Sequence, residues 1–161
     1  MNIKKGAVVL VFLSVLLFGC SRKDVSLIYN DNDKISSNYN TFNIDVKEQK
    51  IYGEKFVGII NKIEGMDTIW TYESEEDSKL DITYLLNVGK GKVKFVLISP
   101  DNSTTNIIER TSESEINNYA SSTMQIKKGL NRIKIVAEKK SSGEFDIKIP
   151  YGKFMELGIE N

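Results

Sequence analysis

Apolar and polar residues alternate with a period of two over most of the chain after about residue 40, which is typical of half-buried β-strands. In the three clearest segments the apolar residues would face a core and the charged residues would face water. These segments are Val93, Phe95 and Leu97 against Lys92 and Lys94; Ile133, Ile135 and Ala137 against Arg132, Lys134 and Glu138; and Phe145, Ile147 and Ile149 against Glu144, Asp146 and Lys148.

The same alternation predicts strands at residues 42–46 and 80–86, and weaker patterns predict strands at 56–63, 66–72, 107–110 and 124–127. Turn-forming residues separate these segments at 89–91, 100–103, 128–129 and 141–143. The spacing therefore predicts eight or nine short strands joined as consecutive hairpins.

Residues 111–122 interrupt the strand pattern. A helical turn capped by Ser112 and Glu115 and a plain surface loop both fit this segment. The C-terminal residues 151–161 keep four apolar side chains, which could dock as a last strand or fray.

No segment after residue 20 shows an apolar stripe at helical spacing over three turns. The sequence therefore predicts an all-β protein with an antiparallel, jelly-roll-like β-sandwich as one domain over residues 41–161. Residues 129–136, followed by 143–147, resemble the closing hairpin of small exported β-sandwich domains, which include jelly-roll modules that bind sugars. This resemblance covers the last half of the chain and implies a fold more than a ligand.

The N-terminal 19 residues have the pattern of a signal peptide. Lys4 and Lys5 precede an uncharged apolar run over residues 6–18, and Arg22 and Lys23 follow soon after its end. A transmembrane helix needs about 20 apolar residues, so this run is short for a permanent span. An uncleaved anchor helix is the alternative, but it gives no reason for a cysteine at position 20.

Leu17, Phe18, Gly19 and Cys20 resemble the lipobox of bacterial lipoproteins. The resemblance implies cleavage before Cys20 and attachment of a diacylglyceryl group to its sulfur. It also implies a domain held on the cell membrane and facing the extracytoplasmic side. Each buried methylene of an acyl chain contributes about 0.8 kcal/mol, so a doubly acylated Cys20 would stay on the membrane.

Residues 20–40 are expected to form the lipidated cysteine and a flexible tether, because Ser, Asn, Asp and Lys dominate this segment. A short apolar island at Val25, Leu27, Ile28 and Tyr29 leaves open a second interpretation, in which the segment docks as an edge strand.

Composition narrows the function by exclusion. The chain balances 22 basic against 22 acidic residues, so nothing favours nucleic acid as a partner. Cys20 is the only cysteine, which leaves no thiol for a disulfide. The chain has no histidine, which excludes His-dependent catalytic triads and imidazole metal sites. We expect no enzyme activity and no cofactor.

Trp70 and Tyr72 are the candidate ligand-binding residues. They share one face of the predicted strand at 66–72, with Asp67, Ile69 and Thr71 opposite. Exposed aromatic rings could stack on a sugar, whereas buried ones would fill the core. Apolar residues on both faces of this strand favour the core.

Four acidic residues lie within residues 73–77 and could offer oxygen ligands to a hard cation such as Ca²⁺. They lack the spacing of a known calcium loop, so a solvated loop between strands is the preferred interpretation. The sequence thus predicts a membrane-anchored, non-catalytic binding module with a glycan as candidate ligand. The alternative is an interaction or structural partner of an envelope transport, sensing or secretion system.

Overall fold

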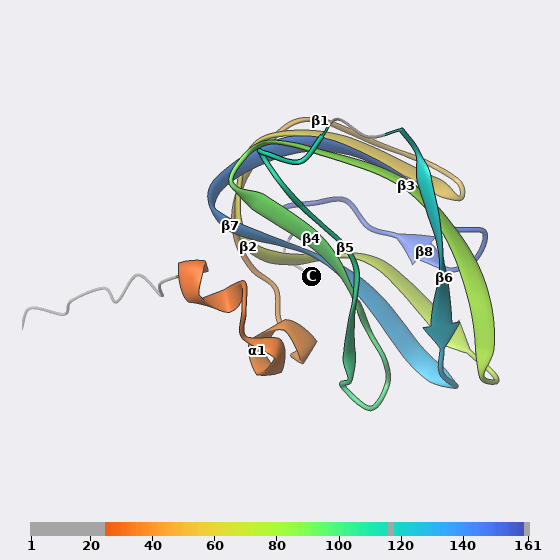
Figure 1. The fold of residues 1–161 in the computed structure, drawn as a ribbon. Helices are drawn as coiled ribbons and strands as arrows, with labels where there is room; N and C mark the ends of the chain where they lie inside the picture. The colour runs from red at the N-terminus through yellow and green to blue at the C-terminus, as the bar shows by residue number, and fades with distance from the viewer. Residues whose placement is uncertain (1–24, 116–117, 160–161) are drawn as a thin grey trace, which may run out of the picture.

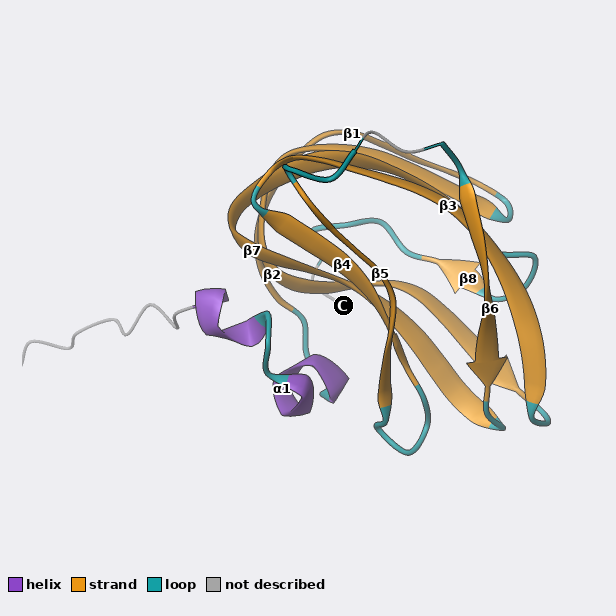
Figure 2. Cartoon of the chain, viewed as in Figure 1, coloured by secondary structure: helices purple, strands orange, loops and turns teal. Residues whose placement is uncertain are grey.

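A computed structural model describes residues 25–115 and 118–159 (Figure 1). The signal peptide and the lipobox residues Leu17, Phe18, Gly19 and Cys20 lie outside the described residues. The described chain is an antiparallel β-sandwich preceded by two short helices (Figure 2). Its elements are η1 (Val25–Ile28), α1 (Asn32–Ser36), β1 (Thr41–Tyr52), β2 (Lys55–Ser74), β3 (Ser78–Lys90), β4 (Lys92–Ile98), β5 (Thr104–Thr111), β6 (Ala120–Ile126), β7 (Gly129–Lys148) and β8 (Lys153–Phe154).

The two layers of the sandwich share the long strands β2 and β7. Layer A consists of β1, the first half of β2, the second half of β7, β3 and β6, in that order. Layer B consists of β8, the second half of β2, the first half of β7, β4 and β5. All strand pairs are antiparallel, as the sequence predicted.

Each shared strand changes layer at an irregular segment. The register of β2 shifts between Ile60 and Gly65, and β7 contains Lys140 with a positive φ of 59° followed by Ser141. The Ser141 hydroxyl accepts a hydrogen bond from Lys92 N and lies within bonding distance of two carbonyls, those of Lys92 and Glu138. Such bulges bend a strand without ending it.

The prediction of consecutive hairpins is wrong for most of the chain. Only β1 with β2 and β4 with β5 pair as sequence neighbours, whereas β7 pairs with β2, β3 and β4. The predicted turn at 141–143 is a bend within β7. The predicted turn at 89–91 joins β3 to β4, which lie in different layers, and Gly91 there has a φ of +73° that favours glycine.

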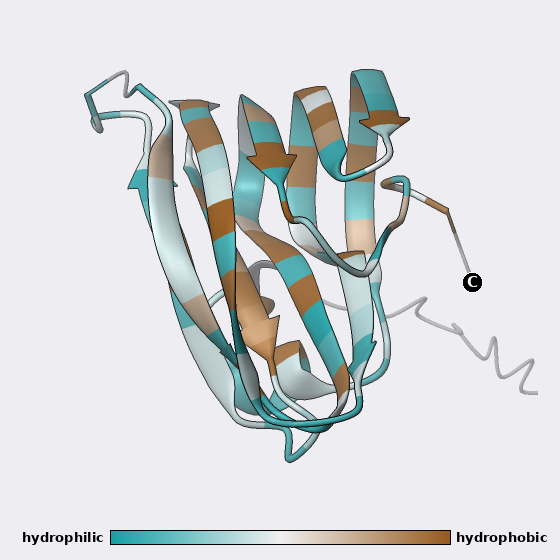
Figure 3. Cartoon of the chain, turned by 90° about the vertical axis from the view of Figure 1, so that its right-hand side faces the viewer, coloured by the Kyte–Doolittle hydropathy of each residue, from teal (hydrophilic) through white to brown (hydrophobic). Residues whose placement is uncertain are grey.

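The inner faces agree with the sequence pattern. All nine apolar residues of the three clearest segments belong to the main core between the layers, together with Phe56 and Trp70. Hydrophobic and hydrophilic residues alternate along the strands in Figure 3. The alternation therefore identified correctly which side of these three segments faces the core.

A second, smaller core lies on the outer face of layer B. The N-terminal helices contribute Ile28, Tyr29 and Ile35 to it, and the strands contribute Met66, Val96, Ile98 and Val136. Asp31 caps α1 by accepting a hydrogen bond from Lys34 N. The prediction of a flexible tether up to residue 40 is therefore wrong from Val25 onward, and the apolar island docks as a 3₁₀ helix rather than an edge strand.

The N-terminal segment over residues 25–40 covers the outer face of layer B, and we call it the cover. It buries three cationic residues that the alternation placed in water. The exposed fractions are 4% for Lys94, 8% for Arg132 and 0% for Lys134. Their side chains do point away from the main core, as predicted, but the N-terminal segment lies over them. On layer A, which no described helix covers, Glu144 and Lys148 are exposed as predicted. Asp146 between them was also predicted to face water, but it is buried, because it pairs with Lys55 and accepts a hydrogen bond from Tyr119.

Loops and the C-terminus complete the fold. After β5 a turn forms at residues 112–114, held by the Ser114 hydroxyl and Thr111, and no helix is found between β5 and β6 in the described part of that connection. The C-terminal segment docks: Met155 N donates to Ile69 O, and Leu157 is buried beside Gln49. Over residues 25–115 and 118–159, no helix is long and apolar enough to cross a membrane.

Candidate functional site

Trp70 is a core residue. Its exposed fraction is 0%, and its indole nitrogen donates a 2.8 Å hydrogen bond to Tyr151 O. A register shift between Thr68 and Trp70 allows Ile69 and Trp70 both to join the main core, although the sequence placed them on opposite faces. Trp70 is thus excluded as a ligand platform, and the favoured interpretation as core is confirmed.

Tyr72, the second predicted ligand residue, is half-buried and packs against the main core. Its ring centroid lies 5.9 Å from that of Trp70 and 6.2 Å from that of the exposed Tyr151. Tyr72 therefore keeps only part of its surface available, because it is the middle ring of a row of three.

A groove lies on the other face of β2. We call it the N-terminal groove; its volume is about 680 Å³. Residues 38–42 form one wall, and β2, β7 and the C-terminal segment supply the rest. The lining residues are Asn38, Tyr39, Asn40, Thr41, Phe42, Thr68, Thr71, Leu130, Arg132 and Met155.

Hydrogen bonds to the strands fix the wall of this groove. Asn40 Oδ1 accepts from Thr68 N at 3.1 Å and from Thr68 Oγ1 at 2.8 Å. Arg132 donates to Ser36 O at 2.8 Å, to Ser37 O at 3.0 Å and to Asn38 Oδ1 at 2.7 Å. The N-terminal segment is thus held in place by side chains on β2 and β7.

Lys134 adds two more bonds to the same wall, since its Nζ donates to Ser37 O at 2.9 Å and to Tyr39 O at 2.6 Å. Burial, with the charge of Arg132 nearby, lowers the pKa of Lys134 to about 8. Burial also lowers the pKa of Arg132. Two cations therefore lie side by side beneath the wall of the groove.

Asp67 lies on β2 between the two cores, opposite Ile135 in the strand register. Its carboxylate accepts a hydrogen bond from Gly158 N at 2.8 Å. Burial raises the pKa of Asp67 to about 6, and the Gly158 hydrogen bond and the charge of Lys134 oppose that shift only in part. Asp67 does not line the N-terminal groove.

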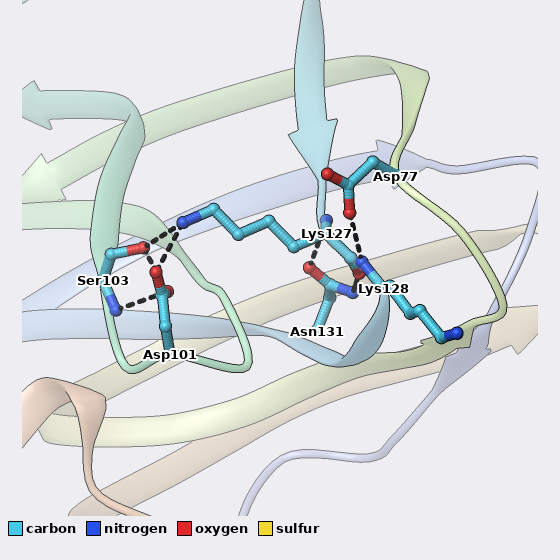
Figure 4. Close-up of polar contacts among 6 residues, drawn as sticks. All are labelled: Asp77, Asp101, Ser103, Lys127, Lys128 and Asn131. Carbon is cyan, nitrogen blue, oxygen red and sulfur yellow. Dashed lines mark hydrogen bonds and ion pairs between the residues drawn. The ribbon is translucent and has the colours of Figure 1, made fainter.

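The acidic segment 73–77 serves a structural contact and shows no metal site. Glu73, Glu75 and Glu76 are exposed, which confirms the solvated interpretation, and Asp77 accepts a 2.8 Å hydrogen bond from Lys128 N (Figure 4). Asn131 closes the same turn through Lys127 N, and the Lys127 ammonium binds Asp101. Among the described residues, no three His, Cys, Asp or Glu side chains converge on a point that could hold a metal ion.

Smaller hollows occur beside Ile59 and Glu144, with volumes of about 490 and 250 Å³. Unlike the N-terminal groove, they are bordered by carboxylates, namely Glu48, Glu144 and Asp146.

Sequence reasoning missed the N-terminal groove for two reasons. Residues 38–40 were assigned to a flexible tether, and Arg132 was assigned to a solvated strand face. The one available signal was the apolar island at residues 25–29, which could dock only on another apolar surface. That surface combines residues from β2, β4 and β7, which are distant in sequence.

No protein-family model matches the chain, and no curated protein matches it. Solved structures similar to it include a family 35 carbohydrate-binding module from an environmental isolate, with a TM-score of 0.40 and 17% identity over 76% of this chain and 91% of that one. A family 4 carbohydrate-binding module has a TM-score of 0.38 and 8% identity over 70% and 78%. A module of Cellvibrio mixtus lichenase 5A in complex with cellotriose has a TM-score of 0.36 and 10% identity over 71% and 92%. Similarities this low identify no ligand for this chain.

Proposed function

We propose that this protein is an exported, lipid-anchored and non-catalytic binding module that holds a saccharide in the N-terminal groove. The observation that supports this function best is the composition of that groove. An exposed aromatic ring at Tyr39, a half-buried one at Phe42 and a set of amide and hydroxyl side chains surround a space of about 680 Å³.

A sugar ring has apolar C–H faces and a rim of hydroxyl groups. Aromatic rings such as those of Tyr39 and Phe42 match the faces, and side chains such as Asn38, Asn40 and Thr71 match the rim. A site of this kind combines apolar surface with a few placed polar groups. Because Asn40 and Arg132 are already fixed by hydrogen bonds, the groove is largely formed before a ligand arrives.

The anchor part of the proposal rests on the lipobox-like residues 17–20 and on the apolar run before them. A lipid on Cys20 would place the domain at the extracytoplasmic surface of the cell membrane. Residues 21–24 span at most about 14 Å when fully extended, so the anchor would keep the domain close to that surface.

Glycan binding is tested with purified protein on an oligosaccharide array, followed by titration calorimetry with the best ligand. Tyr39→Ala should lower the affinity at least tenfold and leave the unfolding midpoint unchanged, since the Tyr39 side chain is 78% exposed and only its backbone binds Lys134. Tyr52→Ala is the matched control, because Tyr52 is 53% exposed on the β1–β2 hairpin. Equal affinities for the two variants would reject the N-terminal groove as the binding site.

The anchor is tested with Cys20→Ser in cells fed a labelled fatty acid. The variant should lose the lipid label and leave the membrane fraction, while its folded domain keeps the same unfolding midpoint. Label retained on the serine variant would disprove the lipobox assignment.

A second candidate function is docking to an envelope protein, and the edges of the sandwich favour it. Among the described strands, β5 and β6 each pair with one neighbour, so each leaves a row of backbone groups to pair with an added strand. Crosslinking from Thr105 and Thr123, one on each of these strands, would reveal such a partner in membranes.

A further inference from the structure

Neither of the two cations beside the N-terminal groove forms an ion pair with an acidic residue of the described chain. The ion pairs of the described residues involve Lys34, Lys55, Lys92 and Lys127, and neither Arg132 nor Lys134 takes part in one. Their hydrogen-bond partners are neutral oxygens and the sulfur of Met66. Asp67 acts on the pKa of Lys134 without forming an ion pair, and no carboxylate acts in this way on Arg132. A buried charge without an opposite charge is costly, and a bound anion would reduce that cost.

Arg132 is the member of this pair that reaches the groove. Its hydrogen bonds engage both hydrogens of Nη1 and one of Nη2. No residue within 25–115 or 118–159 accepts a hydrogen bond from its Nε. The guanidinium therefore keeps donors for a ligand, and its planar shape suits a carboxylate.

The rest of the groove does not oppose a negative charge. Its ten lining residues include one cation and no Asp or Glu, whereas the hollows near Ile59 are bordered by three carboxylates. Lys134 contributes a second positive charge from behind the wall, through its bond to Tyr39 O. The local charge is thus positive on a domain whose overall charge is close to zero.

We infer that the ligand of the N-terminal groove is an acidic saccharide whose carboxylate binds Arg132. This inference rests on the proposed function and narrows it to sugars of the uronic acid class. The aromatic rings would hold the sugar face, and Arg132 would select the charged residue of the chain.

The direct test compares two ligands that share one sugar backbone, one with free carboxylates and the other with these groups neutralised as methyl esters. A galacturonic acid tetrasaccharide and its methyl ester are titrated into the purified protein by calorimetry at low and at moderate salt. The acid should bind at least tenfold more tightly than the ester at low salt, and the difference should narrow as salt rises because charges are screened. Equal affinities would overturn the acidic-ligand inference and leave saccharide binding standing.

Variants at Thr71 test whether the preference for the acid arises in the N-terminal groove. Thr71 is half-buried and lies opposite Arg132 in the strand register. Thr71→Glu should abolish the preference for the acid, since the new carboxylate both repels the ligand and competes for Arg132. Thr71→Gln removes the same hydroxyl without adding a charge, so it should change the affinities for the acid and for the ester by the same factor and leave their ratio as in the wild type.

Arg132→Lys is an independent test, because it keeps the positive charge and removes the planar guanidinium. We expect this variant to lose most of the preference for the acid over the ester. An acid preference that Thr71→Glu leaves unchanged would place the anion elsewhere and overturn the inference. If neither ligand bound in a manner sensitive to Tyr39→Ala, the acidic-ligand inference would fail, while the oligosaccharide array would decide the proposed function separately.

Discussion

The outer faces of the two layers differ although the same strands supply both. The first half of β7 places Arg132, Lys134 and Val136 on the outer face of layer B, where the N-terminal helices cover them. The second half places Glu144 and Lys148 on the outer face of layer A, where they meet water. Alternation therefore tells which side of a strand faces the core, but not whether the other side is solvated.

The cover also gives Lys94 and Lys134 contacts that the sequence pattern did not predict. In the sequence, Lys94 and Lys134 look like ordinary solvated positions on a half-buried strand. In the structure, Lys134 ties down the segment that forms the groove wall, and Lys94 lies 4.6 Å from the ring centroid of Tyr29. A covered sheet face thus forms part of the N-terminal groove, whereas the hollows described on the open face are smaller.

The largest expected effect belongs to the inner face, which both layers share. Phe95 is fully buried in the main core, and truncating such a residue typically costs about 3 to 5 kcal/mol. Phe95→Ala should lower the free energy of unfolding by that amount in urea titrations. Lys148→Ala, on the open face of layer A, should change it by less than about 0.5 kcal/mol. Similar losses for the two variants would show that the assigned faces are wrong.

The second prediction separates the cover from the main core. Ile35 is fully buried under layer B, so Ile35→Ala should cost about 2 to 5 kcal/mol if the cover unfolds with the domain. Leu27→Ala is the matched control, since Leu27 is 66% exposed on the neighbouring helix, and we expect a change within about 0.5 kcal/mol.

Hydrogen exchange would show whether the cover opens alone or unfolds together with the rest of the domain. In Ile35→Ala, faster exchange in α1 with unchanged exchange in β3 would indicate that the cover opens alone. In that case the loss measured in urea would be smaller than predicted, and the cover would be an independent unit.

Strand side and fold class could be predicted from the sequence because they depend on local alternation. The length of β7 could not, because residues 138–143 combine charged residues, Ser and Gly, which also fit a turn. Whether this segment bends or ends depends on Ser141 meeting Lys92 at the start of the neighbouring strand β4. The N-terminal groove needs residues 38–42 to meet Arg132, a contact over more than 90 positions that no local pattern encodes.

The third prediction concerns Asp67, which lies beside the covered face and makes the free energy of unfolding depend on pH. Its pKa in the folded chain is about 6 against an ordinary value of 3.8, so the folded state binds this proton more tightly than the unfolded state. The contribution of Asp67 to the free energy of unfolding is fully present below pH 3.8 and is lost as pH rises through about 6. Between these values the free energy of unfolding falls by at most about 1.4 kcal/mol per pH unit.

Urea titrations at pH 4, 5, 6 and 7 measure this contribution as the difference between wild type and Asp67→Asn. Subtracting the variant removes the opposite contribution of Asp101, whose pKa the contacts with Lys127 and Ser103 lower. A difference that stays constant from pH 4 to pH 7 would show that burial does not raise the pKa of Asp67.

The smallest expected effect compares two lysines that the sequence treats alike. Lys94 lies under the cover against Tyr29, and burial lowers its pKa, whereas Lys148 lies on the open face of layer A. The contact with the ring is favourable, but the burial of the ammonium offsets part of it. Lys94→Ala should therefore cost only about 1 kcal/mol, through the lost ring contact and the lost packing of the side-chain stem. Lys94→Met keeps the stem and should cost less than Lys94→Ala, while Lys148→Ala should stay within about 0.5 kcal/mol. If urea titrations gave equal values for Lys94→Ala and Lys148→Ala, the N-terminal helices would not cover layer B in solution.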